Sequence, residues 1–570
     1  MKRRDFIRNL SLATIPFSIG GLPVKLMAQN SLTRMAKKST NDRVLVLLQM
    51  HGGADGLNAV IPIDAYDLYY SRRANIAIPL KNSLRKLIPL DSTLKKEAQV
   101  GLHPDMFHMK DMYDRGRACI VQGVSYKNNN GSHFRGRDIS FMGGSFDDYF
   151  SSGWVGRYLG QEFDFAHTPY PEAYPNPEML DPLAIEIGSE VSLIFHQENH
   201  IPTSVSIDDP DDFAKMVDGQ EGFDDNKKFD PTGIPPDDLT DSPYWKELKW
   251  ILDLEDKSKD YADRLKTVYD AAAETTVSYP EKYLFNAPAG SMTNPLSHQL
   301  KLIARLLAGG CKTKVFLVKI GGFDTHAEQV ENYDPTMGVH AALMYHISSA
   351  MKAFQDDLAV RGIEDLVLTV TTSEFGRRVH SNGSYGTDHG TGGPVYIFGK
   401  GANPGVIGNV PDLMQDNVEM QYDYRQVYAS ILKDWMGVAP SVIENDIFFK
   451  NFIDGPKEEG VGNYEPITVA QNIISGVKDD FKTSRFTLYN CYPNPVKGDV
   501  NIGFRINVKS HVKLTLLDSQ GRALSVLMNQ EKEEGEHFVK TDMGQYPPGV
   551  YLYQIKAGLL EDTKKMIVTR

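Results

Sequence analysis

Acidic and histidine side chains stand next to several apolar runs of this sequence, at the points where buried strands would end. The segment GGFDTH places Asp324 and His326 two positions apart, directly behind the run 313–320. Side chains two positions apart on an extended backbone point to the same side, so this pair could bind one cation. Carboxylate oxygen and imidazole nitrogen are ligands that zinc, manganese and similar metals accept. The segment therefore predicts part of a metal site.

The same pattern recurs in four other segments. Asp55 follows the run 43–50, Ser132 and His133 follow 117–124, Glu374 and Arg377 follow 365–372, and Asp388 and His389 stand in GTDHG just before 393–399. In an open parallel sheet the carboxyl ends of the strands share one edge, where ligands bind. Gathering carboxylates and imidazoles there is unfavourable, because like charges repel and burial disfavours ionisation. A divalent cation would reverse that cost, and we expect one at this edge.

The predicted site has two parts. Asp324, His326 and His389 form one metal site, with the neighbouring Asp388 as a further metal ligand, while Asp55 and Glu374 hold a second metal or orient bound water. Each residue also has a structural alternative. Asp55 could cap a helix, Ser132 could form a turn, the histidines could be hydrogen-bonded framework residues, and Glu374 could pair with Arg377. The gathering of so many acids and histidines at one expected sheet edge favours the metal site.

These residues need a scaffold of strands and helices to position them. From about residue 42 to 464, near-continuous β-branched runs alternate with helical patterns, as at 297–308 and 340–360. Runs of this kind suit strands that are covered on both faces. The pattern predicts an α/β domain with a mostly parallel central sheet flanked by helices. An acidic stretch rich in proline and glycine, 208–241, predicts an exposed insertion.

The last part of the chain has a different periodicity. From 486 to 570, short alternating segments are separated by turn-forming residues, which predicts a small all-β sandwich. YPNP at 492–495 and PPGVY at 547–551 resemble the C-terminal sorting domain of type IX (Por) secretion cargo. That resemblance implies passage across an outer membrane by the type IX secretion machinery. The alternative is an immunoglobulin-like binding module.

The first 28 residues have the pattern of a twin-arginine export signal. Arg3 and Arg4 precede a modest apolar stretch, 10–27, and Ala28 is a small residue before the expected cleavage. A membrane anchor is the alternative, but prolines and glycines interrupt the stretch. We expect the twin-arginine translocation machinery as a partner and no transmembrane segment in the mature chain. The expected location is extracellular or on the outer cell surface.

Composition excludes other classes of protein. The chain has 570 residues and a formal net charge of −13, and it lacks the concentrated positive charge that phosphate-backbone recognition needs. We therefore expect no nucleic-acid partner. The 3 cysteines lie far apart in the sequence, so it contains neither a CxxC metal motif nor a disulfide framework.

The site segments, in this order, resemble the uncharacterised DUF 1501 family over most of residues 42–440. They are LLQMHGGADGLNAVIP, NNNGSHFRGRDI, GWVGRYL, KIGGFDTHAEQ and TTSEFGRRVHSNGSYGTDHGTGGPVYIFG. The family is similar to the alkaline phosphatase and sulfatase superfamily, whose metal-binding aspartates and histidines accompany a serine, threonine or formylglycine nucleophile. The resemblance implies that fold, and Ser132 as the nucleophile. Those enzymes carry Asp-His where this chain has Glu374 and Phe375, which puts the second metal site in doubt.

These observations predict an exported, metal-dependent hydrolase of phosphate or sulfate esters, with glycan esters among the substrates. A zinc or manganese ion would polarise the ester oxygen and lower the pKa of water or of Ser132. His133 would be the general acid or base, and Arg377 or Arg135 would neutralise the oxyanion. The alternative is a noncatalytic surface binding or assembly protein on the same scaffold.

Overall fold

The structure is a computed structural model in which the chain divides into two compact units, residues 1–473 and 474–570. It describes residues 18–19, 22–23, 42–188, 191–198, 201–207, 260–458, 462–471, 486–488, 491, 494–506, 509–519, 522–533, 535–557 and 560–569. The twin-arginine signal predicted at 1–28 lies outside these ranges, apart from the two-residue strands β1 (Ser18–Ile19) and β2 (Leu22–Pro23). The insertion predicted at 208–241 lies outside them as well. The predicted domain boundaries stay predictions.

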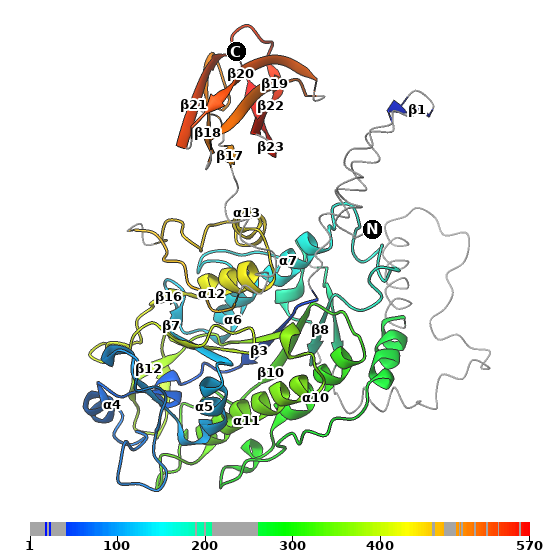
Figure 1. The fold of residues 1–570 in the computed structure, drawn as a ribbon. Coiled ribbons are helices and arrows are strands. Elements are labelled where there is room, and N and C mark those ends of the chain that lie inside the picture. Colours follow the sequence, from blue (N-terminus) through cyan, green and yellow to red (C-terminus); the bar gives the residue numbers. More distant parts are fainter. Residues whose placement is uncertain are drawn as a thin grey trace, which may run out of the picture. The chain divides into compact units, whose positions relative to one another are not determined.

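A nine-stranded sheet forms the centre of the first unit (Figure 1). Its order is β15 (Gly405–Ile407), β7 (Ala118–Ser125), β14 (Gly393–Phe398), β11 (Val367–Thr372), β3 (Val44–Met50), β10 (Val315–Ile320), β8 (Ala184–Ile187) and β9 (Ser204–Ile207), and β16 (Tyr422–Asp423) pairs with β7. β14 runs antiparallel to both of its neighbours, and the other strands of this sheet are parallel to one another. The predicted mostly parallel sheet is confirmed.

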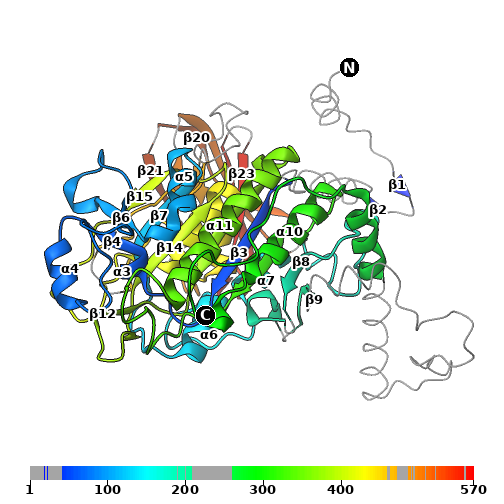
Figure 2. The same cartoon turned by 90° about the horizontal axis from the view of Figure 1, so that it is seen from below.

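Helices cover both faces of the sheet, and each face has its own apolar core. α5 (Phe107–Asp114), α10 (Pro295–Ala308) and α11 (Val339–Val360) pack on one face, with α10 beside α11 (Figure 2). α6 (His133–Met142), α7 (Trp154–Glu162) and α12 (Tyr424–Ser430) pack on the other. Along β3, Val46 and Leu48 enter the first core, whereas Leu45 and Leu47 enter the second. Burial on both faces explains why the strands read as continuous apolar runs.

Smaller elements surround this layered core. They are α3 (Gly56–Ala59), β4 (Val60–Pro62), α4 (Tyr66–Arg72), β5 (Ile88–Pro89), β6 (Val100–Leu102), β12 (Arg377–Ser381), β13 (Thr387–His389), α13 (Pro440–Val442) and two π-helical turns, Ile431–Trp435 and Ile443–Ile447. Short 3₁₀ turns occur at Lys96–Ala98, Pro104–Met106, Leu193–Phe195, Ala289–Ser291 and Glu364–Leu366. β12 and β13 form an antiparallel hairpin that pairs Arg377 with His389. Among the described helices, none combines the length and apolar character needed to cross a membrane.

The second unit is all-β, as its alternating pattern predicts. One antiparallel sheet contains β17 (Phe486–Leu488), β18 (Asp499–Ile506) and β21 (Gly535–Asp542), and the other contains β20 (Ala523–Lys532), β19 (Ser510–Leu517), β22 (Gly549–Ala557) and β23 (Leu560–Val568). Val500, Ile502 and Phe504 alternate along β18 into the core that both sheets share. This unit has its own apolar core.

We expect Leu47→Ala in the middle of β3 to lower the free energy of unfolding by about 2–5 kcal/mol, because Leu47 is fully buried and its loss leaves a cavity. All four tryptophans of the chain lie within residues 1–473, so denaturant unfolding followed by tryptophan fluorescence reports on the first unit. The same change at the fully exposed Leu84 is the control and should shift the value by less than about 0.5 kcal/mol. Equal shifts for both variants would contradict the assignment of β3 to the core.

Candidate metal centre

Four side chains from three loops converge at the carboxyl-terminal edge of the central sheet. His133 is the first residue of α6, Asp324 and His326 follow β10, and His389 is the last residue of β13. The Nε2 atom of His389 lies 3.1 Å from His133 Nε2 and 2.7 Å from His326 Nε2. Asp324 Oδ1 lies 3.5 Å from His133 Nε2, 3.2 Å from His326 Nε2 and 3.5 Å from His389 Nε2. We call these four residues the His/Asp cluster.

The spacing of the cluster suits one divalent cation. Zinc bound at about 2.0–2.1 Å in a tetrahedral site holds its ligand atoms roughly 3.3 Å apart. The ligand atoms of His133, Asp324 and His389 all lie within 4.8 Å of one another, and His326 Nε2 is within 3.2 Å of two of them. His133, His389 and Asp324 thus offer two imidazole nitrogens and one carboxylate oxygen to one ion, a donor set that zinc and manganese accept. The residues present therefore fit such an ion.

An outer hydrogen bond orients one imidazole of the cluster, and a carboxylate lies behind another. His389 Nδ1 donates to the carbonyl oxygen of Gly131 at 2.7 Å, and this leaves Nε2 as the lone-pair nitrogen that faces the cluster. His326 Nδ1 faces Asp388 Oδ1 at 3.6 Å, and Asn382 Nδ2 donates to the same carboxylate oxygen at 3.1 Å. Asp388 thus lies behind His326 instead of among the four converging atoms. Its placement suits an orienting residue better than the predicted ligand.

Arg377 lies beneath the cluster with its guanidinium fully committed. It donates to Asp324 Oδ1 at 2.8 Å, and to the carbonyl oxygens of Gly53 at 2.6 Å, Thr387 at 2.9 Å, Phe323 at 3.0 Å and Gly52. Burial tends to raise the pKa of Asp324, but the hydrogen bond and charge of Arg377 outweigh it and lower that pKa. Arg377 is itself 1% exposed. It therefore positions Asp324 and does not face a substrate.

Glu374 binds the neighbouring loop and His51. Its carboxylate accepts from the backbone N–H groups of Gly52 at 3.1 Å and Gly53 at 3.0 Å, and from His51 Nδ1 at 2.6 Å. The hydrogen bond with Glu374 raises the pKa of His51, whose side chain is 51% exposed and whose ring lies 6.3 Å from that of His133. We predicted no role for His51 from the sequence. Its position directly after β3, at the same edge as the other site residues, was the signal that could have found it.

Asp55 is buried behind the cluster and is committed to other groups. It accepts from Leu57 N at 3.2 Å at the start of α3, pairs with Arg73 Nη1 at 2.7 Å, and accepts from Gln329 Nε2 at 2.6 Å. Gln329 Oε1 accepts in turn from the hydroxyls of Thr325 and Thr387, each at 2.9 Å. Asp55 therefore supports the two loops from behind, and we leave it out of the proposed metal site.

Ser132 and Arg135 have local partners at the start of α6. Ser132 is the N-cap residue, and its hydroxyl accepts from the backbone N–H of Arg135 at 3.4 Å. The Arg135 guanidinium donates to the carbonyl of Phe146 at 2.8 Å and stacks at 4.0 Å on the ring of Tyr149. Ser132 as a nucleophile stays a prediction.

A cleft lies beside the cluster at the same edge of the sheet. Its space is about 520 Å³ with the open solvent at its mouth included, and it is lined by the ends of β7 and β11, the residues that follow them, the start of β14, and residues of α6 and α12. Phe375 separates the two features, since it lines the cleft while its ring lies 4.7 Å from that of His133 and 4.5 Å from that of His389. We call this feature the Tyr126 cleft, after a tyrosine in its lining.

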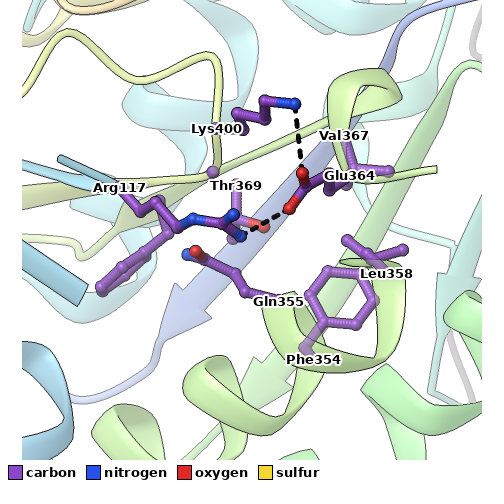
Figure 3. Close-up of a pocket in the computed structure, with 10 residues that line it drawn as sticks. Arg117, Phe354, Gln355, Leu358, Glu364, Val367, Thr369 and Lys400 are labelled. Carbon is purple, nitrogen blue, oxygen red and sulfur yellow. Dashed lines mark ion pairs between the residues drawn. The ribbon is translucent and has the colours of Figure 1, made fainter. Parts of the chain in front are cut away.

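A smaller hollow of about 230 Å³ lies at the opposite edge of the sheet, where β11 begins (Figure 3). Glu364 pairs there with Arg117 at 2.7 Å and with Lys400 at 3.1 Å. The buried amide of Gln355 also lines it, without a hydrogen-bond partner among the described residues. The length of the strands separates this hollow from the cluster, so it is no part of the site.

Two family models match separate parts of the chain. Residues 252–441 match the family described as "Protein of unknown function (DUF1501)", and residues 490–569 match the "Secretion system C-terminal sorting domain". The predicted resemblance to both is confirmed over these residues. No curated protein matches the chain.

Solved structures that resemble the chain do so at low identity. A protein in the alkaline phosphatase superfamily from Vibrio parahaemolyticus is 10% identical, with 89% of this chain and 85% of that chain covered and a TM-score of 0.28. PsFucS1 sulfatase from Pseudoalteromonas sp. is 12% identical, with 92% and 86% covered and a TM-score of 0.29. Dimeric latent PorU from Porphyromonas gingivalis is 16% identical over 19% of this chain and 10% of that chain, with a TM-score of 0.13. The sheet topology identifies the fold.

We expect Asp55→Ala to lower the free energy of unfolding by about 3–5 kcal/mol, because it leaves the buried charge of Arg73 without its partner. Denaturant unfolding of the full chain measures this change. The double variant Asp55→Ala, Arg73→Met should recover part of the loss, since it removes the unpaired charge. If Asp55→Ala instead lost metal while its free energy of unfolding stayed unchanged, Asp55 would be a metal ligand.

We expect Asp388→Ala to weaken metal binding about 10- to 100-fold, because His326 loses the carboxylate behind its Nδ1. Competition with a chromophoric chelator measures the affinity. Asp416→Ala is the matched control, since Asp416 is an exposed carboxylate that faces His380 Nδ1 at 3.5 Å. If both variants bind metal as tightly as the parent chain, Asp388 does not orient a ligand.

Proposed function

We propose that this chain is an exported, metal-dependent hydrolase of phosphate or sulfate esters. The observation that carries the proposal is the convergence of the imidazole nitrogens of His133 and His389 and the Asp324 carboxylate at the carboxyl edge of the sheet, with His326 Nε2 beside the last two. A zinc or manganese ion held there would supply Lewis-acid activation of an ester and of water. The cluster is also accessible, because the side chains of Asp324 and His326 are 51% and 47% exposed.

The charge of the site favours an anionic substrate. Asp324 is the one carboxylate among the proposed ligands, so a divalent cation leaves the ligand set itself positive, while Asp388, 3.6 Å behind His326, and Glu374 add negative charge outside it. Arg377 adds a further positive charge 2.8 Å from Asp324 Oδ1. Positive charge in a partly buried site attracts a phosphate or sulfate group. Anionic esters as a class fit this charge.

The residues around the cluster have separate tasks in this proposal. The metal is held by His133, Asp324, His326 and His389. Arg377 holds Asp324, and in this proposal it does not have the oxyanion-binding role that we expected from the sequence. His133 turns its Nε2 toward the cluster, which suits a ligand better than a proton carrier. His51 is held at Nδ1 by Glu374, and its half-exposed ring suits the exchange of a proton at Nε2.

Export is the second part of the proposal. The match of residues 490–569 to a secretion sorting domain supports handling by the type IX secretion machinery. We infer that the first unit is the passenger and that its location is extracellular or on the outer cell surface. Entry by the twin-arginine route belongs to the same proposal and rests on Arg3 and Arg4.

A noncatalytic surface binding or assembly protein on the same scaffold is the second candidate. One observation favours it: Asp55 and Glu374, the predicted ligands of a second metal, are bound to Arg73, His51 and backbone N–H groups. A single metal can still support hydrolysis, so the first candidate stands ahead.

We expect the parent chain to bind one zinc or manganese ion and to hydrolyse p-nitrophenyl phosphate or p-nitrophenyl sulfate. Asp324→Ala should lose the metal and lower kcat/KM at least about 100-fold, because it removes the one carboxylate among the four converging atoms. Plasma mass spectrometry and the release of p-nitrophenol measure the two effects. Asp365→Ala, which changes an exposed carboxylate at the opposite edge, is the control.

Each other outcome has a definite meaning. Metal binding in the parent chain without turnover of either ester would favour the noncatalytic candidate. Equal metal content and equal turnover in the parent and in Asp324→Ala would remove the proposed centre. Tryptophan fluorescence of each variant checks that its first unit is folded.

A further inference from the structure

The Tyr126 cleft and the His/Asp cluster share one wall and one loop. Phe375 contacts the rings of His133 and His389 and lines the cleft. Asn129 also lines the cleft, and its Oδ1 accepts from the backbone N–H of Gly131, whose carbonyl orients His389. A molecule that occupies both places must therefore pass the ring of Phe375.

The lining of the cleft is rich in hydroxyls and poor in charge. Several of its hydroxyls already bind the protein: Ser140 donates to the carbonyl of Arg137, Thr371 to that of Tyr396 and Thr391 to that of Val418. Glu374 is the charged residue of the lining, and its carboxylate already accepts from His51, Gly52 and Gly53. Negative charge in the wall disfavours an anion within the cleft. The cleft therefore suits the neutral part of a substrate and the cluster suits the anionic part.

Tyr126 differs from the other two tyrosines of the lining. The hydroxyl of Tyr424 binds the carbonyl oxygens of Ile139 and Gly144 at 2.9 and 2.7 Å, and the hydroxyl of Tyr428 donates to Thr372 Oγ1 at 3.0 Å. The hydroxyl of Tyr126 is buried, and it has no hydrogen-bond partner among the described residues. Tyr126 itself is 5% exposed. Buried hydroxyls almost always have a partner, so this one points to a ligand or a bound water.

A second hydroxyl with spare capacity stands next to it in the chain. Ser125 is the last residue of β7 and is 6% exposed. Its Oγ accepts a long hydrogen bond of 3.4 Å from Asn129 Nδ2, and that contact does not use the proton of the Ser125 hydroxyl. Tyr126 and Ser125 could therefore bind a partner that both donates and accepts hydrogen bonds, as an alcohol does.

We infer that the Tyr126 cleft binds the neutral, polyhydroxylated alcohol of the ester, with the hydroxyl of Tyr126 as its specificity-determining group. This inference rests on the proposed function, because it assigns the anionic half of the same substrate to the His/Asp cluster. A sugar or polyol monoester has the required chemistry, with hydroxyls at one end and a phosphate or sulfate at the other. Phe375 offers its ring as an apolar wall between the two halves.

The test compares esters with and without hydroxyls on the alcohol. Glucose 6-phosphate and glucose 6-sulfate are assayed beside ethyl phosphate and ethyl sulfate, in the parent chain and in Tyr126→Phe. We expect Tyr126→Phe to lower kcat/KM for the glucose esters about 3- to 10-fold, as the loss of one neutral hydrogen bond does, and to leave the ethyl esters unchanged. Tyr158→Phe is the matched control, since it removes another buried tyrosine hydroxyl that has no partner in the described part of the chain, from α7 and outside the cleft lining.

Binding of unesterified glucose separates this inference from the proposed function. Weaker calorimetric binding of glucose to Tyr126→Phe than to the parent would support the subsite even if no ester were turned over. Turnover of the ethyl esters with no preference for glucose esters and no binding of glucose would overturn the subsite and leave the hydrolase standing. An equal effect of Tyr126→Phe on both ester series, or none on either, would show that the hydroxyl binds water or only supports the fold.

Discussion

The buried guanidinium of Arg377 is the interaction on which the site depends. A buried charge is unfavourable unless it is paired and hydrogen-bonded. Arg377 meets this condition with one carboxylate and four backbone carbonyls, which come from the loops after β3 and β10 and from β13. The same contacts that satisfy the guanidinium bring three distant segments together and hold Asp324 in its ionised form. A metal ligand set assembled from separate loops needs a central group of this kind.

Close backbone approach is the second condition for this assembly. Gly52 has a φ of +121°, and a Cβ atom at that position would lie 2.4 Å from the backbone nitrogen of Asp324. A side chain there would push the β3 loop away from the β10 loop and separate Arg377 from the carbonyls that it binds. Glu374 closes the arrangement from the other side, because it accepts from the N–H groups of Gly52 and Gly53. Backbone hydrogen bonds thus do much of the positioning at this edge.

The edge has two compartments of different electrostatic character. The His/Asp cluster becomes positive when it holds a divalent cation, whereas the neighbouring cleft has hydroxyls and one hydrogen-bonded carboxylate. Phe375 stands between them and contacts both. This division suits a substrate with one anionic and one neutral, polar end. The acidic residue at position 374 has a structural task of its own, because it anchors His51 and the loop that follows β3.

Local patterns in the sequence determined the strands, the main helices, the all-β second unit and the residue types at the sheet edge. These features depend on periodicity and on neighbours in the chain, and both can be read from the sequence alone. The D-x-H spacing of Asp324 and His326 belongs to this group.

Strand direction and side-chain partners were decided only by the tertiary structure. His389 reaches the carboxyl edge because β14 runs antiparallel, so that the residues before it lie where the other strands end. Asp55 turns inward to Arg73, Arg377 is buried under Asp324, and His51 is drawn to Glu374. Each of these side chains pairs with a residue from another element of the fold. Pairing stabilises a buried charge only once the chain has folded.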